Sequence, residues 1–181
     1  DRRQRQMCIR DRRYYEEEGR AELTPRDFGI LMHRVFENAA TTDEIYMAIE
    51  AMTQDGVLDE KEAPRLRELV EKALADPVTA EWFGGRWQVV RNENEIILPG
   101  SGTTRRPDRV MTDGERAVVV DYKFGDRETA RHRKQIREYL RLLRQMGYTR
   151  TEGYLWYVRL GRTERVEEKE LALIHISEPT R

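Results

Sequence analysis

The sequence predicts an α/β fold in which a central mixed sheet is flanked by helices and preceded by an N-terminal helical segment. Two observations carry this prediction. Apolar residues recur at helical spacing through the first half of the chain, whereas patterns typical of strands begin after Pro77. A long basic amphipathic helix then precedes a further apolar strand. The order of three helices, three strands, a helix and a strand indicates one sheet between helices.

Three helices are predicted in the first half. The first begins at Thr24 and Pro25, with threonine as the N-cap and proline at the first helical position. The second covers residues 43–52, and the third covers residues 60–74, with Pro64 in its first turn. The apolar stripe of the first helix consists of Phe28, Leu31, Met32, Val35, Phe36 and Ala39.

The second half is predicted to form the sheet. Residues 86–98 and 105–111 read as strands joined by a turn at 99–102, and a second turn follows at 112–115. Residues 117–122 form a short apolar run of the kind buried on both faces. A helix over 127–146 ends before Gly147. Residues 153–160 form another strand, and 166–171 add an edge strand.

The composition is that of a soluble globular domain. The 181 residues are 37% charged and 38% apolar, and the net charge is −1, so any surface that binds nucleic acid must be local. The sequence has no apolar run of about 18 residues and no signal peptide, which predicts a cytoplasmic protein without a membrane partner. The single Cys8 excludes a disulfide framework and a four-cysteine metal site.

Both ends of the chain resemble translated sequencing adapter, at residues 7–12 and 173–181. We therefore expect residues 1–13 and 173–181 to be foreign and residues 14–172 to form the domain. On that interpretation the chain is a fragment of a longer protein, and Cys8 and His175 carry no functional information. The alternative is a charged, disordered terminus at each end.

An acid, a second acid and a lysine mark one end of the predicted hairpin. Asp108 opens the first strand and Asp121 closes the second, so their carboxylates are expected to meet at one edge of the sheet. Paired carboxylates suit Mg²⁺ or Mn²⁺. Lys123 follows Asp121 on the same strand face, where it can orient a water or offset charge on a phosphate. This set predicts metal-assisted hydrolysis of phosphodiester bonds.

The alternative is that Asp108 and Asp121 are ordinary acids next to turns and that Lys123 is a solvated strand end. For an isolated acid–x–lysine triplet this alternative is favoured. The hairpin and the buried strand before Asp121 strengthen the metal interpretation, and these residues alone leave both interpretations open.

Four segments resemble the PD-(D/E)XK nuclease superfamily, in particular its RecB/AddA-like branch at the C-terminus of bacterial helicase–nucleases. Residues 106–110 (RPDRV) resemble the first acidic strand, and 120–123 (VDYK) resemble the acid–x–lysine strand. Residues 29–37 resemble the upstream helix whose histidine joins the metal site. Gln135 and Tyr139 match a Q-x-x-x-Y pattern on the following helix. These motifs stand in the expected order over residues 24–160.

The resemblance implies a role for each residue. His33, Asp108 and Asp121 would hold the metal ion together with the backbone carbonyl of Tyr122, and Lys123 would polarise the attacking water. The strand over 89–95 resembles one that contributes a further catalytic acid, for which we favour Glu93 over Glu95. The two residues are expected to share one strand face. A polar, half-exposed strand is the alternative there.

The helix over 127–146 is predicted to face DNA. By resemblance Gln135 and Tyr139 approach the active site and the DNA backbone, and Arg131 and Lys134 belong to a basic series that can contact phosphates. Such a series is usually a solvated face, and Tyr139 can equally belong to the core. Acids are scarce on this helix, however, in a chain that is otherwise balanced.

The resemblance implies a Mg²⁺-dependent deoxyribonuclease, acting as an exonuclease in double-strand break repair and recombination. Its partners would be DNA, a helicase motor upstream on the same full-length chain, and a second helicase–nuclease subunit. The sequence has no phosphate-binding loop of the G-x-x-x-x-G-K-[ST] type. The alternatives are a non-catalytic DNA-binding or scaffolding copy of the fold, and a stand-alone endonuclease on branched or single-stranded DNA.

Overall fold

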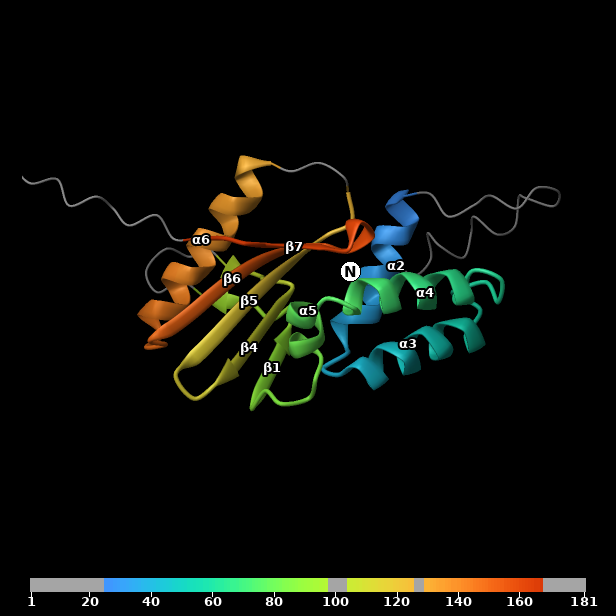
Figure 1. Ribbon diagram of the computed structural model, residues 1–181, viewed down its shortest axis with the longest axis horizontal. Helices are drawn as coiled ribbons and strands as arrows, with labels where there is room; N and C mark the ends of the chain where they lie inside the picture. Colours follow the sequence, from blue (N-terminus) through green and yellow to red (C-terminus); the bar gives the residue numbers. More distant parts are fainter. Residues whose placement is uncertain (1–24, 98–103, 126–128, 168–181) are drawn as a thin grey trace, which may run out of the picture.

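A computed structural model describes residues 25–97, 104–125 and 129–167. In this part of the chain a five-stranded sheet has the order β1-β4-β5-β6-β7, and β2 and β3 form a separate two-stranded sheet. Figure 1 shows helices packed around the strands. The predicted α/β fold with a central mixed sheet is confirmed. The adapter-like ends and the predicted turn at 99–102 lie outside the described residues.

Four helices precede the sheet: α2 (Pro25–Glu37), α3 (Thr42–Gln54), α4 (Ala63–Leu74) and α5 (Pro77–Trp82). The first three confirm the predicted helices, although α4 begins at Ala63 rather than at residue 60, with Pro64 in its first turn. Thr41 caps α3 in a capping box with Glu44. The short α5 was not predicted. Its N-cap is Asp76, whose side chain accepts a hydrogen bond from the Val78 N–H.

The main sheet consists of β1 (Val89–Asn92), β4 (Arg109–Asp113), β5 (Arg116–Lys123), β6 (Arg150–Tyr157) and β7 (Arg162–Arg165). β5 and β6 are parallel and are connected through α6 (Ala130–Gln145), and the other neighbouring strands are antiparallel. Of the edge strand predicted at 166–171, residues 166 and 167 are not in a strand, and residues 168–171 lie outside the described residues. β6 is followed by a 3-10 turn, η2 (Val158–Leu160), which ends at Gly161 with φ 56°, and the edge strand β7 begins at Arg162.

The two predicted strands at 86–98 and 105–111 are each interrupted, at the same level of the hairpin. After β1 the chain resumes as β2 (Ile96–Ile97), and β3 (Thr104–Arg105) precedes β4. Glu93 has φ 49°, a left-handed conformation that a strand cannot contain. Pro107, on the other side, has no N–H to donate to a ladder. The Glu93 N–H instead donates to the Asp108 carbonyl at 2.9 Å. The single strands were therefore wrong, and Asp108 lies before β4 rather than in it.

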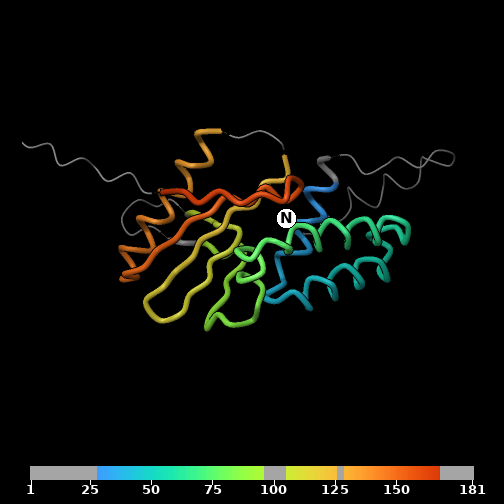
Figure 2. The backbone as a smooth tube through the Cα atoms, in the orientation of Figure 1, coloured from blue at the N-terminus to red at the C-terminus, as the bar shows by residue number. Residues whose placement is uncertain are grey.

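Both faces of the sheet pack against helices, and Figure 2 shows α6 on one side of the strands and α2–α5 on the other. Successive residues of β5 point to opposite faces: Val118, Val120 and Tyr122 pack with the α2–α5 helices, and Val119 packs with α6. The α6 face is completed by Ile136, Leu140, Leu142, Leu143, Leu155 and Tyr157. This two-sided burial confirms the prediction for β5 and holds its last residues firmly between the two helical layers.

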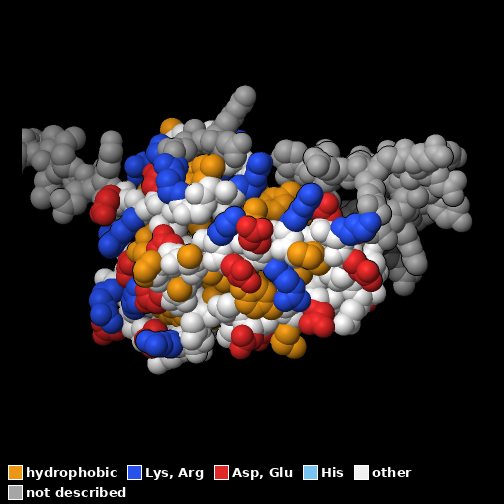
Figure 3. Space-filling view, turned by 45° about the vertical axis from the view of Figure 1, so that its right-hand side comes forward, with side chains coloured by type: hydrophobic (Ala, Val, Ile, Leu, Met, Phe, Trp, Pro, Cys, Tyr) orange, Lys and Arg blue, Asp and Glu red, His pale blue; other side chains and the backbone are white. Residues whose placement is uncertain are grey.

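The outer surface carries charges of both signs. Figure 3 shows acidic and basic side chains interspersed over the face that it draws, which agrees with the balanced composition. No helix among the described residues combines the length and the apolar character that crossing a bilayer requires.

Gly153 allows α6 to lie directly on β6. A Cβ at this position would overlap Cγ2 of Ile136 and lie 3.1 Å from Cγ of Leu140. We expect Gly153→Ala to lower the free energy of unfolding by about 1–3 kcal/mol, because overpacking forces neighbouring groups to shift. Urea denaturation measures this loss. Gly125→Ala, whose new methyl would meet nothing within 4 Å, is the control, and an equal loss in both variants would contradict the account.

Candidate metal centre

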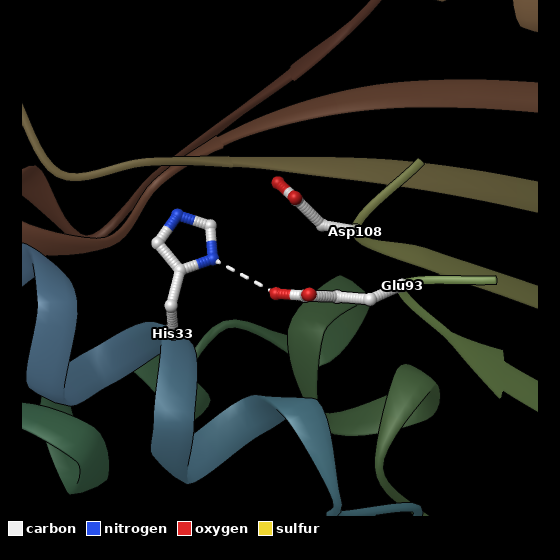
Figure 4. A group of neighbouring side chains, drawn as sticks. All are labelled: His33, Glu93 and Asp108. Atoms are coloured by element: carbon white, nitrogen blue, oxygen red, sulfur yellow. Dashed lines mark ion pairs between the residues drawn. The ribbon is translucent and has the colours of Figure 1, made fainter. Parts of the chain in front are cut away.

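Three side chains from separate elements meet at one end of the sheet. His33 lies on α2, Glu93 directly follows β1, and Asp108 directly precedes β4. Each offers a ligand atom, and these atoms all lie within 4.8 Å of one another. Figure 4 shows the imidazole and the two carboxylates pointing toward a common space. Nδ1 of His33 is 3.6 Å from Oε1 of Glu93.

His33 is held at this position by the packing of α2 against the end of β5. Gly29, one turn earlier on α2, is buried, and a Cβ there would be 3.4 Å from Cβ of Phe124. The absence of a side chain allows the helix to approach. The ring of Phe124 then packs edge-on against the imidazole, with centroids 4.9 Å apart. Burial lowers the pKa of His33, which favours the neutral imidazole that binds metal ions.

Asp108 is fixed by the end of β5. Its Oδ2 accepts a hydrogen bond from the Tyr122 N–H at 2.5 Å. Burial, and next the charge of Asp121, raise the pKa of Asp108 to about 7. A like charge nearby disfavours the ionised form of Asp108, and a bound cation would offset this cost.

Asp121 is the residue opposite Asp108 across the hairpin, because Arg109 pairs with Val120. Its neighbours on β5 face α2, so the alternation of the strand directs Asp121 toward α6. Asp121 is only 3% exposed, and its Oδ2 forms an ion pair with Nζ of Lys123. Asp121 is not one of the three residues that meet within 4.8 Å.

The donor set fits a hard divalent ion. One neutral imidazole and two carboxylates converge. Asp121 adds a further carboxylate from β5, at the position opposite Asp108. Oxygen ligands with one nitrogen suit Mg²⁺ or Mn²⁺. His33, Glu93, Asp108 and Asp121 are therefore the residues that would hold such an ion. The role of the Tyr122 carbonyl as a ligand stays a prediction.

Glu93 and Glu95 differ in position more than the sequence predicted. The left-handed backbone of Glu93 turns its side chain out of the strand and toward His33. Glu95 is exposed and lines a groove between β1, β4 and the end of α6 instead. The expectation that the two acids share one strand face was wrong, because β1 ends at Asn92.

Gln135 and Tyr139 lie on the face of α6 that meets the sheet. Nε2 of Gln135 donates to the Tyr139 hydroxyl at 2.9 Å. Tyr139 is 1% exposed, so its ring belongs to the core and its hydroxyl orients Gln135. Burial raises the pKa of Tyr139 to about 12, and the charges of Asp121 and Asp108 add to this effect. Direct contact of Tyr139 with DNA would require its hydroxyl to become accessible.

The basic residues of α6 differ in their surroundings. Arg131 and Lys134 are exposed. Arg133 forms an ion pair with Glu164 on β7, and Arg137 donates to the carbonyl of Glu167. Arg131 and Lys134, the two basic residues predicted to contact DNA, thus lie in solvent.

Three residues near the site were missed by sequence reasoning. Arg106 forms an ion pair with Glu93, and Arg109 is entirely buried beside Asp108. His132 lies on the first turn of α6 with a buried Nδ1, and burial, and next the charge of Lys123, lower the pKa of His132. Arg106 and Arg109 lie close to Asp108 in the sequence, and His132 lies on the same helix as Gln135. Only the fold shows which groups surround them.

We expect Glu93→Gln to weaken the binding of Mn²⁺ by about 10- to 100-fold, since the amide keeps the shape but loses the charged oxygen. Titration calorimetry on the full chain measures the affinity. Glu95→Gln, two residues further along the chain and outside the group, is the matched control and should bind Mn²⁺ as the unaltered protein does. Equal affinities for both variants would remove Glu93 from the site.

A comparison with protein families finds one described as the PD-(D/E)XK nuclease superfamily, whose model matches residues 3–179. The match covers nearly the whole chain, including the elements that carry His33, Asp108 and Asp121. No protein in a search of curated sequences matches the chain.

Proposed function

Because the chain belongs to the PD-(D/E)XK nuclease superfamily, we propose that it hydrolyses phosphodiester bonds of DNA at the site formed by His33, Glu93, Asp108 and Asp121. The observation that carries this proposal is the convergence of an imidazole and two carboxylates within 4.8 Å, next to the ion pair of Asp121 with Lys123. When bound there, a divalent ion supplies Lewis-acid chemistry: it polarises the phosphate and lowers the pKa of water.

The residues of the chain would share the remaining work. Asp121 on β5 and Asp108 beside it would provide negative charge for the ion. Because Asp121 is buried and Asp108 is partly buried, an unpaired charge on them would cost free energy, and a cation would offset this cost. The side chain of Lys123 is 20% exposed, so its ammonium reaches both Asp121 and the solvent. From this position it can orient the attacking water or stabilise the charge that develops on the phosphate. Gln135, held by Tyr139, would face the nucleic acid.

The more specific assignment concerns the cellular role. The helix with His33, the two acidic strands and the Gln135–Tyr139 pair follow the order found in helicase-linked nucleases. This order supports a Mg²⁺-dependent exonuclease that acts in double-strand break processing, with a helicase motor upstream on the full-length chain and a second subunit as partner. Sequencing upstream in the source DNA tests this assignment: a helicase motor in frame is expected, and a complete gene without one would contradict it.

Cleavage of labelled linear duplex and single-stranded DNA by the full chain tests the activity. We expect degradation with Mg²⁺ or Mn²⁺ and none with EDTA. Asp121→Ala and Lys123→Ala should both lose the activity while they remain folded. A folded protein that binds DNA and cleaves none of these substrates with either ion would contradict the proposal and favour a non-catalytic binding domain.

We expect the double variant Arg131→Ala/Lys134→Ala to bind DNA less tightly and with a smaller salt dependence. Each phosphate contact contributes about 0.9 to the slope of log affinity against log salt, so two lost contacts reduce the slope by about 2. Fluorescence anisotropy at several salt concentrations measures it. The double variant Lys61→Ala/Arg65→Ala removes the same charge from the region of α4 and should leave the slope unchanged. Equal slopes for both double variants would exclude α6 as the DNA-binding face.

A further inference from the structure

Arg109 is a buried cation at the centre of the chain segments that carry the metal ligands. Its side chain is 0% exposed. Nη1 donates to the carbonyl oxygen of Ala39 at 2.7 Å, and Nη2 donates to those of Ala40 at 2.8 Å and Trp82 at 2.7 Å. None of these acceptors carries a full charge. Burying a guanidinium costs free energy unless its N–H groups form hydrogen bonds. The folded state is therefore stable only when the surrounding carbonyls keep these positions.

A side-chain amide completes this set of acceptors. Nη1 of Arg109 also donates to Oδ1 of Asn92 at 3.1 Å, and Nδ2 of Asn92 donates to the Ala39 carbonyl at 3.0 Å. Arg109, Asn92 and the Ala39 carbonyl are therefore joined in a closed set of hydrogen bonds. The ring of Phe83 lies under the guanidinium, 4.0 Å from its carbon to the ring centroid, and fixes its plane.

These contacts join the three segments from which the ligands come. Ala39 and Ala40 follow α2, which carries His33. Asn92 is the last residue of β1, immediately before Glu93. Arg109 itself is the first residue of β4, immediately after Asp108. The planar fork of an arginine fixes both the distance and the angle between its acceptors, which a lysine cannot do.

We propose that Arg109 is a positioning residue: together with Asn92, it sets the separation of α2, the end of β1 and the start of β4, so that the side chains of His33, Glu93 and Asp108 reach one ion. The inference rests on the proposed function, since it concerns the same metal site. It assigns to Arg109 no contact with the ion or with DNA. Its effect passes through the backbone of the three segments.

Mn²⁺ affinity of the full chain, measured by titration calorimetry, tests the inference. Arg109→Lys keeps the charge and loses the fork, and Asn92→Ala removes only the amide. We expect both to bind Mn²⁺ about 10- to 100-fold more weakly, as is typical when groups that orient metal ligands are lost. Leu66→Ala is the control. Leu66 is buried in the core on α4, so this variant loses stability without changing the segments that carry the ligands, and its affinity should be unchanged.

The outcomes separate the inference from the function on which it rests. Weaker binding by both variants, with Leu66→Ala unaffected, supports the positioning role, because a general loss of stability would weaken Leu66→Ala as well. If the unaltered protein binds Mn²⁺ and Asn92→Ala binds it equally well, the positioning role is overturned and the metal site stands. If the unaltered protein binds no Mn²⁺, both are overturned. Should Arg109→Lys fail to fold, Asn92→Ala decides.

Discussion

Asp108→Asn is expected to lower the rate of DNA cleavage by about 10³-fold and, at the same time, to make the metal-free protein more stable. The amide oxygen can still accept the Tyr122 N–H, which donates at 2.5 Å in the structure, so the local fold is kept. The substitution removes a charged metal ligand. Loss of about 4 kcal/mol of transition-state stabilisation lowers the rate by about 10³-fold.

The gain in stability follows from the raised pKa of Asp108. Burial and the charge of Asp121 raise this pKa from 3.8 to about 7, so the folded protein holds the proton more tightly than the unfolded chain. The stability that the protonated Asp108 contributes is complete below pH 3.8 and is lost as the pH rises through about 7. Above that range the ionised carboxylate destabilises the fold, and a neutral amide removes this cost.

Two measurements check this prediction: the melting temperature at pH 8 in EDTA, and the single-turnover cleavage rate with Mn²⁺. Asp113→Asn removes an exposed charge at the other end of β4 and should change neither. An Asp108→Asn protein that cleaves DNA at the original rate would remove Asp108 from the site. A lower melting temperature would show that the carboxylate stabilises the metal-free fold.

Lys123→Met is expected to lower the cleavage rate by about 10²- to 10⁴-fold, the range found for a group that positions or moves a proton. Unlike the loss of an acid, this change should not weaken Mn²⁺ binding. The ammonium of Lys123 forms an ion pair with Asp121, so its removal leaves that carboxylate free to bind the ion. The cleavage rate and the Mn²⁺ affinity therefore separate the role of the lysine from that of the ligands.

Single-turnover cleavage and Mn²⁺ calorimetry on the same preparation measure both quantities. Lys72→Met is the control, because Lys72 pairs with Glu68 on the exposed side of α4, and it should match the unaltered protein. If Lys123→Met lost Mn²⁺ binding together with cleavage, the lysine would act by holding the site together. An unchanged cleavage rate would exclude it from the reaction.

The sequence predicted the parts of the site that depend on regular structure. The apolar stripe of α2 places His33 at its margin, and the continuous apolar run before Asp121 is a strand buried on both faces. The antiparallel hairpin brings Asp108 opposite Asp121. Each of these follows from a local repeat, of 3.6 residues in the helix and of two in the strands, which the amino-acid pattern records directly.

The rest depends on contacts between distant segments. The break at Glu93 could not be predicted, because a glutamate at φ 49° is held there by its hydrogen bond to Asp108 across the hairpin. Arg109 read as one of many charged residues, although it is buried and donates to backbone carbonyls from two other segments and to the side chain of Asn92. For Tyr139 the sequence left a core position and a DNA-facing position open, and the fold places it in the core. Local patterns do not specify such pairings, and tertiary structure decides them.

The central claim is that one divalent ion binds between α2 and the ends of β1, β4 and β5. Anomalous diffraction from crystals of the full chain grown with Mn²⁺ tests it most directly, because the metal appears in the map independently of the protein atoms. The account predicts an anomalous peak within coordination distance, about 2.0–2.5 Å, of His33, Glu93 and Asp108, with Asp121 on its α6 side. A well-ordered structure with no peak between these residues would contradict it.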